Sequence, residues 1–227
     1  MNRKNTLGGL ITDALKKNWT LRREELGADA RLSGKGMTFT TEAYAVESVG
    51  HLCIMNMKAM LGLMKMETVV LSTLDRDMPL FNLDWVGVFG KQTQIAELYD
   101  TQLAPFPQED QEKLAEIKKR YADLQDYSSG KAHWYDAVLY PCSCSKTGKK
   151  ISERLSSMAE EYVAAFTGLL AAAPACDRAE KEAKVRAYAE RLVAEGGPAV
   201  DQVTKLFGRE TASRLILQHM YGLPPKA

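Results

Sequence analysis

Two acidic residues stand out because each lies inside a run that is otherwise suited to burial. Asp84 lies in MPLFNLDWVGVFG (78–90), and Glu67 lies in KMETVVLSTL (65–74). With the period of two of a β-strand, Asp84 shares a face with Asn82, and Glu67 is expected to point the same way from a neighbouring strand. Two carboxylates on an apolar floor repel each other and are poorly solvated, so the pKa of at least one rises. The pattern predicts an acid that can donate a proton near neutral pH.

Each of these polar residues also has a purely structural interpretation. Asp84 could cap a backbone turn or pair with an arginine, and Glu67 could pair with Lys65 or Lys91. Asn82 could orient Asp84, or it could satisfy backbone groups at the edge of a pocket. The residue types alone leave these alternatives open.

Other kinds of site have little support in the sequence. The pair in PCSCSK (141–146) has only His133 nearby, so a zinc site would lack ligands, and we expect the cysteines to pack as small hydrophobic residues. There is no phosphate-binding loop, dinucleotide-binding glycine motif, HExxH helix or nucleophile elbow. We therefore expect no bound metal, nucleotide or flavin. An enzyme of this sequence would receive its reagent with the substrate or from a partner protein.

Composition fits one globular domain that can bury a sizeable core. The chain has 227 residues, of which 45% are hydrophobic and 26% charged. The 30 basic residues nearly cancel the 29 acidic ones, so the global charge predicts neither nucleic acid nor a membrane as a partner. A local basic patch could still dock an acidic partner. No signal peptide or membrane-spanning run is recognisable, so we expect a cytoplasmic protein.

The hydrophobic periodicity indicates a sheet in the middle of the chain with helices before and after it. This order predicts an α+β fold with helices over both sheet faces, and the short turn at Gly90 and Lys91 makes the sheet at least partly antiparallel. Residues 19–36 are expected to be loop, and HWYDAVLYPCSCSK (133–146) is expected to be extended. Strands are predicted in MTFTTEAYAV, HLCIMNM, MKMETVVLSTL, LFNLDWVGVF and TQIAELYD, and helices over 5–18, 108–126, 151–172, 177–195, 199–207 and 209–220.

Two distant segments resemble the ferredoxin-dependent bilin reductases, which reduce biliverdin to phytobilins. PLFNLDWVGVFGKQTQIAELYDTQ is similar to the family's middle segment, which runs from a proline through an aspartate-bearing strand into a hairpin. VRAYAERLVAEGGPAVDQVTKLFGRETASRLILQHMYG is similar to the family's C-terminal helices. Between them, HWYDAVLYPCSCSK and the helix over 151–172 are consistent with the family's order. The likeness covers about residues 40–222.

The resemblance implies a three-layer α/β/α sandwich with a central, mainly antiparallel β-sheet. It implies one domain over 1–227, with the main sheet in 37–100 and the C-terminal helices in 151–221. The bilin would lie between the sheet and those helices. Such enzymes are oxidoreductases that bind no metal or flavin of their own; they take single electrons from reduced ferredoxin and protonate bilin radicals with acidic side chains.

The resemblance also assigns roles to residues. Asp84 falls on the family's central aspartate, a proton donor, and Glu67 falls where some members have a catalytic histidine. Gly196 and Gly197 stand where the family has an Asn-Asp turn whose aspartate some members use, with Glu195 beside them and Asp201 one turn on. This loss leaves open a non-catalytic tetrapyrrole-binding protein of the same fold. Lys149, Lys150 and Arg154 are further candidates for binding bilin propionates or docking ferredoxin, and the expected substrate-binding residues are Asn82, Val86, Val69, Ser143, Ser145 and Lys146.

Overall fold

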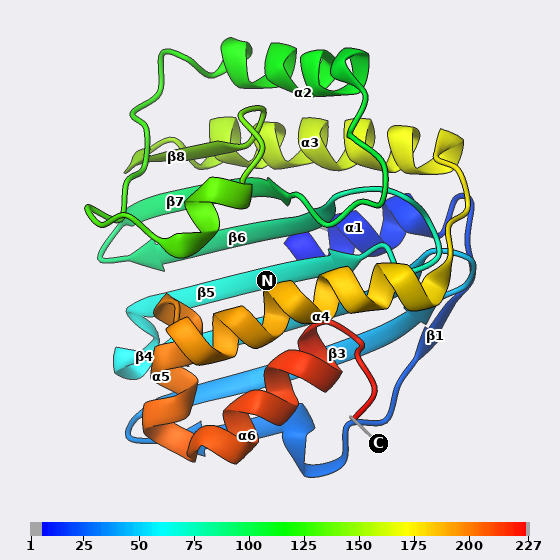
Figure 1. Ribbon diagram of the computed structural model, residues 1–227. Coiled ribbons are helices and arrows are strands. Elements are labelled where there is room, and N and C mark those ends of the chain that lie inside the picture. The colour runs from blue at the N-terminus through cyan, green and yellow to red at the C-terminus, as the bar shows by residue number, and fades with distance from the viewer. Residues whose placement is uncertain (1–5, 226–227) are drawn as a thin grey trace.

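An antiparallel sheet of eight strands forms the middle layer of the protein (Figure 1). The computed structural model describes residues 6–225, apart from the side chains of 198 and 199. The strands run in the order β1-β3-β4-β5-β6-β7-β8, and β2 pairs with β3 beside β1. The strands are β1 (Leu21–Arg23), β2 (Arg31–Gly34), β3 (Met37–Val46), β4 (Gly50–Ala59), β5 (Met64–Ser72), β6 (Leu80–Val88), β7 (Lys91–Tyr99) and β8 (Cys144–Lys149).

Helices cover both faces of this sheet, which confirms the predicted three-layer α/β/α sandwich (Figure 1). One face carries α1 (Leu7–Leu15) and α3 (Ser152–Ala172), with α2 (Gln108–Arg120) packed against α3. The other carries α4 (Arg178–Glu195), α5 (Pro198–Phe207), α6 (Arg209–Arg214) and the π-helical turn η5 (Leu215–Met220). Three short 3-10 helices complete the elements: η2 (Gly27–Ala30), η3 (Met60–Gly62) and η4 (Trp134–Val138).

The period of two along β6 divides the core into two clusters. Phe81 and Leu83 point toward α1 and α3, and the ring of Phe81 stacks on Phe166 with centroids 4.3 Å apart. Leu80 points the other way and joins the cluster beneath α4, which includes Tyr99. Because alternate side chains of a strand face opposite sides of the sheet, β6 contributes to both layers.

The sequence predictions fail mainly at the sheet margins. Residues 19–36, expected to be loop, contain β1, η2 and β2. The two strands, β1 and β2, each pair with the long strand β3. Their three or four residues are too short to show a period. The stretch 133–146, expected to be extended, forms η4, makes an isolated bridge from Leu139 to Tyr99 and enters a strand, β8, only at Cys144. Over residues 6–225, no helix is both long and apolar enough to cross a bilayer.

Candidate functional site

Asp84 lies in the middle of β6 on the face that α4 and η5 cover. The register places it opposite Thr68 on β5 and Ile95 on β7. Thr68 Oγ1 donates a hydrogen bond to Asp84 Oδ1, and Asn82 Nδ2 donates one to Asp84 Oδ2 at 2.7 Å. The contact with Asn82 agrees with the interpretation in which the amide orients the acid. Both carboxylate oxygens are therefore fixed by side chains of the sheet itself.

A second acid, Glu97, lies next to this pair and was missed in the sequence. It is opposite Asn82 on β7, and Tyr99 Oη donates to its Oε2 at 2.5 Å. The pKa of Glu97 is raised to about 7, chiefly by burial and also by the neighbouring Asp84 charge, and the hydrogen bonds from Tyr99 and Asn82 oppose the rise. Burial also raises the pKa of Asp84, and the bonds from Thr68 and Asn82 oppose that rise only in part. The site holds two coupled acids with raised pKa values.

The sequence does contain a signal for Glu97. The two-residue turn at Phe89 and Gly90 pairs Val88 with Lys91, and counting outward from it places Glu97 opposite Asn82. The alternation of QIAELY then puts Glu97 on the face of Asp84. Reading the hairpin register, and not only each strand alone, finds the second acid.

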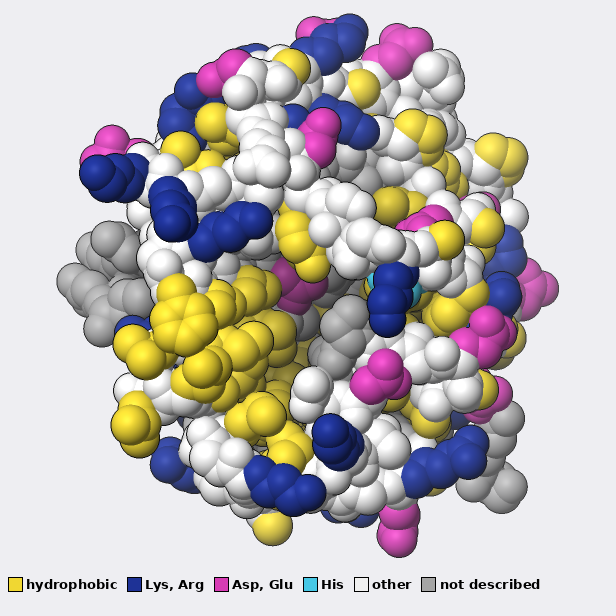
Figure 2. Space-filling model, turned by 90° about the vertical axis from the view of Figure 1, so that its left-hand side faces the viewer, with side chains coloured by type: hydrophobic (Ala, Val, Ile, Leu, Met, Phe, Trp, Pro, Cys, Tyr) yellow, Lys and Arg dark blue, Asp and Glu magenta, His cyan; other side chains and the backbone are white. Residues whose placement is uncertain are grey.

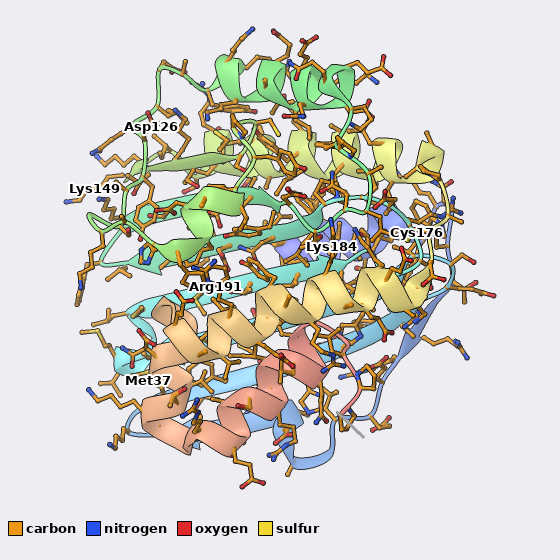
Figure 3. All side chains as sticks on the ribbon, viewed as in Figure 1. Met37, Asp126, Lys149, Cys176, Lys184 and Arg191 are labelled. Atoms are coloured by element: carbon orange, nitrogen blue, oxygen red, sulfur yellow. The ribbon has the colours of Figure 1, made fainter. Side chains whose placement is uncertain are left out.

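Aromatic rings from the C-terminal helices and η4 roof the two acids. Tyr188 of α4 lies 5.0 Å from the Tyr99 ring and 5.9 Å from the Tyr221 ring, centroid to centroid. Trp134 packs against Tyr188 at 5.3 Å, and the Arg191 guanidinium lies over the Trp134 ring at 4.6 Å (Figure 3). The rings pack on one another, and those of Tyr99, Tyr188 and Tyr221 are themselves buried, so they close the site above the acids.

The floor between the acids and the end of the sheet is apolar. On the face of Asp84, β5 continues through Met66 and Met64, and β6 continues through Val86 and Val88. All four side chains are half-buried, and Asp84 also keeps some accessible surface. Figure 2 shows a hollow at this end of the molecule, lined by hydrophobic side chains, with an acidic side chain inside it. Val86, which the sequence predicts to contact a substrate, lies on the face of Asp84 and is half-buried, and its role stays a prediction.

The expectation that Glu67 faces Asp84 is wrong. Glu67 pairs with Trp85 across β5 and β6, so it points to the opposite side of the sheet. There it is buried, and its carboxylate accepts hydrogen bonds from Leu7 N at 3.0 Å and Gly8 N at 2.9 Å. The register of β5 with β6 places Thr68 beside Asp84, and a shift of one residue in register reverses the face on which a strand residue lies. Glu67 is an acceptor for the first turn of α1.

Two expected substrate contacts are also on the wrong face. Val69 is buried with the core cluster beneath α1, because it pairs with Leu83. Lys146 pairs with Gln94 and is 3% exposed; its Nζ contacts Leu124 O at 3.2 Å and Asp126 Oδ1 at 2.6 Å. Neither side chain can contribute to the hollow beside Asp84.

Ser143, just before β8, and Ser145, within β8, lie in different environments. Ser143 is buried and its Oγ accepts from Leu98 N at 3.0 Å, so it holds the edge of the sheet. Ser145 pairs with Ile95, which places it on the face of Asp84, half-buried. Of the further cations, Arg154 forms an ion pair with Asp123 at 2.8 Å.

The C-terminal turn carries two glycines where the resemblance implies an Asn-Asp pair. Gly196 has φ +85°, and a Cβ there would lie 2.6 Å from Asp201 Oδ1, so the turn requires glycine. Glu195 forms an exposed ion pair with Arg191 at 2.6 Å. Trp134 Nε1 donates to Gly196 O at 3.4 Å, which ties the turn to η4.

The four cysteines are free thiols. Cys53, Cys142 and Cys144 are buried, and Cys144 Sγ contacts Met158 Sδ at 3.6 Å within the core. Burial raises the pKa of Cys53 to about 12. Among the residues described by the structure, no three His, Cys, Asp or Glu side chains gather in a group that could hold a metal ion.

The comparisons with known proteins identify a fold. No family profile matches the chain, and no curated protein matches it. Solved structures do: the structure of phytochromobilin synthase from tomato in complex with biliverdin superposes with a TM-score of 0.72 at 14% identity. The match covers 98% of this chain and 86% of the tomato chain. The protein therefore has the fold of a bilin reductase, and its sequence is only distantly similar to that of the tomato protein.

Proposed function

We propose that the protein binds a linear tetrapyrrole, biliverdin or a related bilin, in the hollow beside Asp84 and reduces it. The observation that carries the proposal is the pair of coupled acids with raised pKa values, Asp84 and Glu97, on an apolar floor under aromatic rings. Glu97, with a pKa of about 7, can hold a proton near neutral pH, and burial disfavours the charged form of Asp84 where a hydrophobic pigment would lie. The structure of the tomato protein, which has the same fold, contains biliverdin, and this supports a tetrapyrrole as the ligand of the present protein.

In this mechanism the chain supplies protons and a partner supplies electrons. Adding two electrons to a conjugated double bond requires two protons. Asp84 gives the first from a carboxyl that Thr68 and Asn82 hold in one orientation. Glu97, with a pKa of about 7, supplies the second, either directly or by reprotonating Asp84. The electrons come singly from reduced ferredoxin, a partner proposed from the resemblance, and no bound cofactor is invoked.

The test is an anaerobic assay with biliverdin, reduced ferredoxin and the purified protein, followed by visible absorbance. We expect pigment binding and conversion by the wild type. Asp84→Asn keeps the size of the side chain and removes the proton, so we expect binding to persist and turnover to fall by about 100-fold or more.

Glu67→Gln is the matched control, because it also replaces a buried strand acid but on the other face of the sheet. We expect it to bind and convert the pigment as the wild type does. Wild-type turnover in Asp84→Asn would exclude Asp84 as the donor, and the absence of any spectral shift with bilins would refute the proposal as a whole.

A second candidate function is pigment binding without reduction. It is favoured by the Gly196–Gly197 turn, which places no carboxylate where the resemblance implies a second donor aspartate. The same assay separates the two functions. Tight binding with a stable spectrum under reduced ferredoxin assigns the binding function, and conversion assigns the reductase.

A further inference from the structure

Large apolar side chains project into solvent at one end of the sheet. They lie at two neighbouring hairpin turns: Leu61 is 105% exposed and Leu63 58% in the β4–β5 turn, and Phe89 is 63% exposed in the β6–β7 turn. Phe89 N donates to Leu63 O at 3.4 Å, so the turns lie side by side. Met60, 50% exposed, belongs to the same group. We call Met60, Leu61, Leu63 and Phe89 the apolar tip.

The backbone of the apolar tip is adverse for these residue types. Met60, Leu61 and Phe89 have φ of +52°, +55° and +47°, in the left-handed region that costs a bulky residue about 1–2 kcal/mol. Glycine or asparagine is preferred at such turn positions. Folding alone therefore does not account for bulky apolar side chains that face water at strained positions. A contact outside the folded chain does.

The turns and strand ends that form and flank the tip carry lysines. Six exposed lysines lie in the segments 34–38, 57–66, 86–92 and 147–151, which contain no aspartate or glutamate. The chain as a whole has a net charge of +1, so the rest of the chain is net acidic. Figure 2 shows the hydrophobic side chains gathered at this end with Lys and Arg on the margin, and Lys149 lies at this end in Figure 3. The six are Lys35, Lys58, Lys65, Lys91, Lys149 and Lys150.

The lysines flank the tip from both faces of the sheet. Lys65 pairs with Gly87, on the side of α1, whereas Lys91 and Lys149 pair with each other on the side of Asp84. A second copy of this chain would bring like charges together, so the surface does not suit self-association. Projecting apolar side chains set between lysines match a bilayer interface with anionic headgroups, where the apolar groups enter the acyl boundary and the ammonium groups stay at headgroup level.

We propose that this end of the sheet docks the protein on the surface of a membrane that contains anionic phospholipid. The apolar tip inserts at the interface, and the six lysines bind the headgroup charge. This attachment is peripheral and needs no spanning helix. It does not depend on the chemistry in the hollow.

The test is flotation of the full protein with vesicles of phosphatidylcholine alone or of phosphatidylcholine with phosphatidylserine. We expect binding only to the vesicles with phosphatidylserine, weakened by salt. The double variant Leu61→Asn/Phe89→Asn should lose most of the binding. Asparagine tolerates positive φ, and Asn-Gly is the preferred pair for a two-residue hairpin turn, so the variant should keep its fold.

Two controls isolate the surface. Ser48→Asn places an asparagine at another left-handed position, φ +59°, in the β3–β4 turn, and should bind normally. Lys149→Gln/Lys150→Gln should lower vesicle partitioning by about 30-fold, whereas Lys16→Gln/Lys17→Gln, which removes the same charge after α1, should have little effect. Absence of binding to phosphatidylserine vesicles would overturn the proposal. So would equal binding by all variants, or binding to soluble polyglutamate but not to vesicles, which would assign the surface to an acidic protein.

Discussion

Glutamine in place of Glu97 should make the protein more stable at neutral and alkaline pH. The pKa of this buried acid is about 7 in the folded protein against an ordinary value of 4.5, because burial disfavours its charge. Between these pH values the folded protein holds a proton that the unfolded chain has released. Stability therefore decreases as pH rises through this window, by up to about 1.4 kcal/mol per pH unit, and the loss is nearly complete by about pH 8.

The size of the effect follows from the two pKa values. The difference between 4.5 and about 7 corresponds to about 3 kcal/mol at full ionisation, of which about 2.5 kcal/mol falls between about pH 5 and about pH 8. Glu97→Gln can still accept the hydrogen bond from Tyr99 and no longer titrates. The wild type should weaken over this range by about 2–3 kcal/mol more than the variant does. Burial also raises the pKa of Asp84, so the free energy of unfolding of both the wild type and Glu97→Gln decreases further as pH rises.

Urea unfolding at a series of pH values measures the difference. Glu42→Gln is the control for replacing a carboxylate by an amide beside a tyrosine, because Tyr44 donates to Glu42 in the same two-residue arrangement on β3. Parallel stability curves for the wild type and Glu97→Gln across the window would refute a raised pKa at Glu97. They would also remove the second proton donor from the proposed mechanism.

Three further predictions concern residues around the core and the site. Glu67→Ala should lower the free energy of unfolding by about 1–3 kcal/mol, measured in urea, because two buried backbone amides lose their acceptor. Lys181 is 0% exposed and donates to two backbone carbonyls, and burial lowers its pKa to about 8. The free energy of unfolding should therefore rise between pH 8 and pH 10.5, because the unfolded chain holds a proton that the folded protein has released. Lys181→Met should abolish that rise and lower the free energy of unfolding by about 3 kcal/mol. Thr68→Val removes a bond that lowers the pKa of Asp84, so the Asp84 carboxyl resonance in a ¹³C NMR titration should move at higher pH than in the wild type.

The layers of the fold could be predicted from the sequence because its long elements have clear periods. Both sides of β6 were assigned correctly, since Phe81 and Asn82 alternate in polarity. What failed depends on register between strands. An offset of one residue between β5 and β6 moved Glu67 to α1 and put Thr68 beside Asp84, and no property of KMETVVLSTL alone sets that offset.

The site was predictable where a hairpin fixes the register and not elsewhere. Glu97 could have been found by counting from the turn at Gly90, whereas the roof could not, because Tyr188 reaches Tyr99 through the packing of α4 on the sheet. The apolar tip was equally invisible in the composition. The charges of the six lysines that flank the tip cancel against acids elsewhere in the chain, and only folding gathers these lysines at one end of the sheet.

The consecutive order of β3 to β7 has a consequence for how the protein is made. Each of these strands pairs with the next along the chain, so the sheet can grow hairpin by hairpin during synthesis, whereas α4, α5 and η5 come from the last quarter of the sequence. Until those helices arrive, Asp84 and Glu97 face water and remain ionised at neutral pH. Closure of the roof is therefore expected to be coupled to proton uptake at Glu97, whose pKa is about 7 in the folded protein, so mildly acidic solution should favour the closed state.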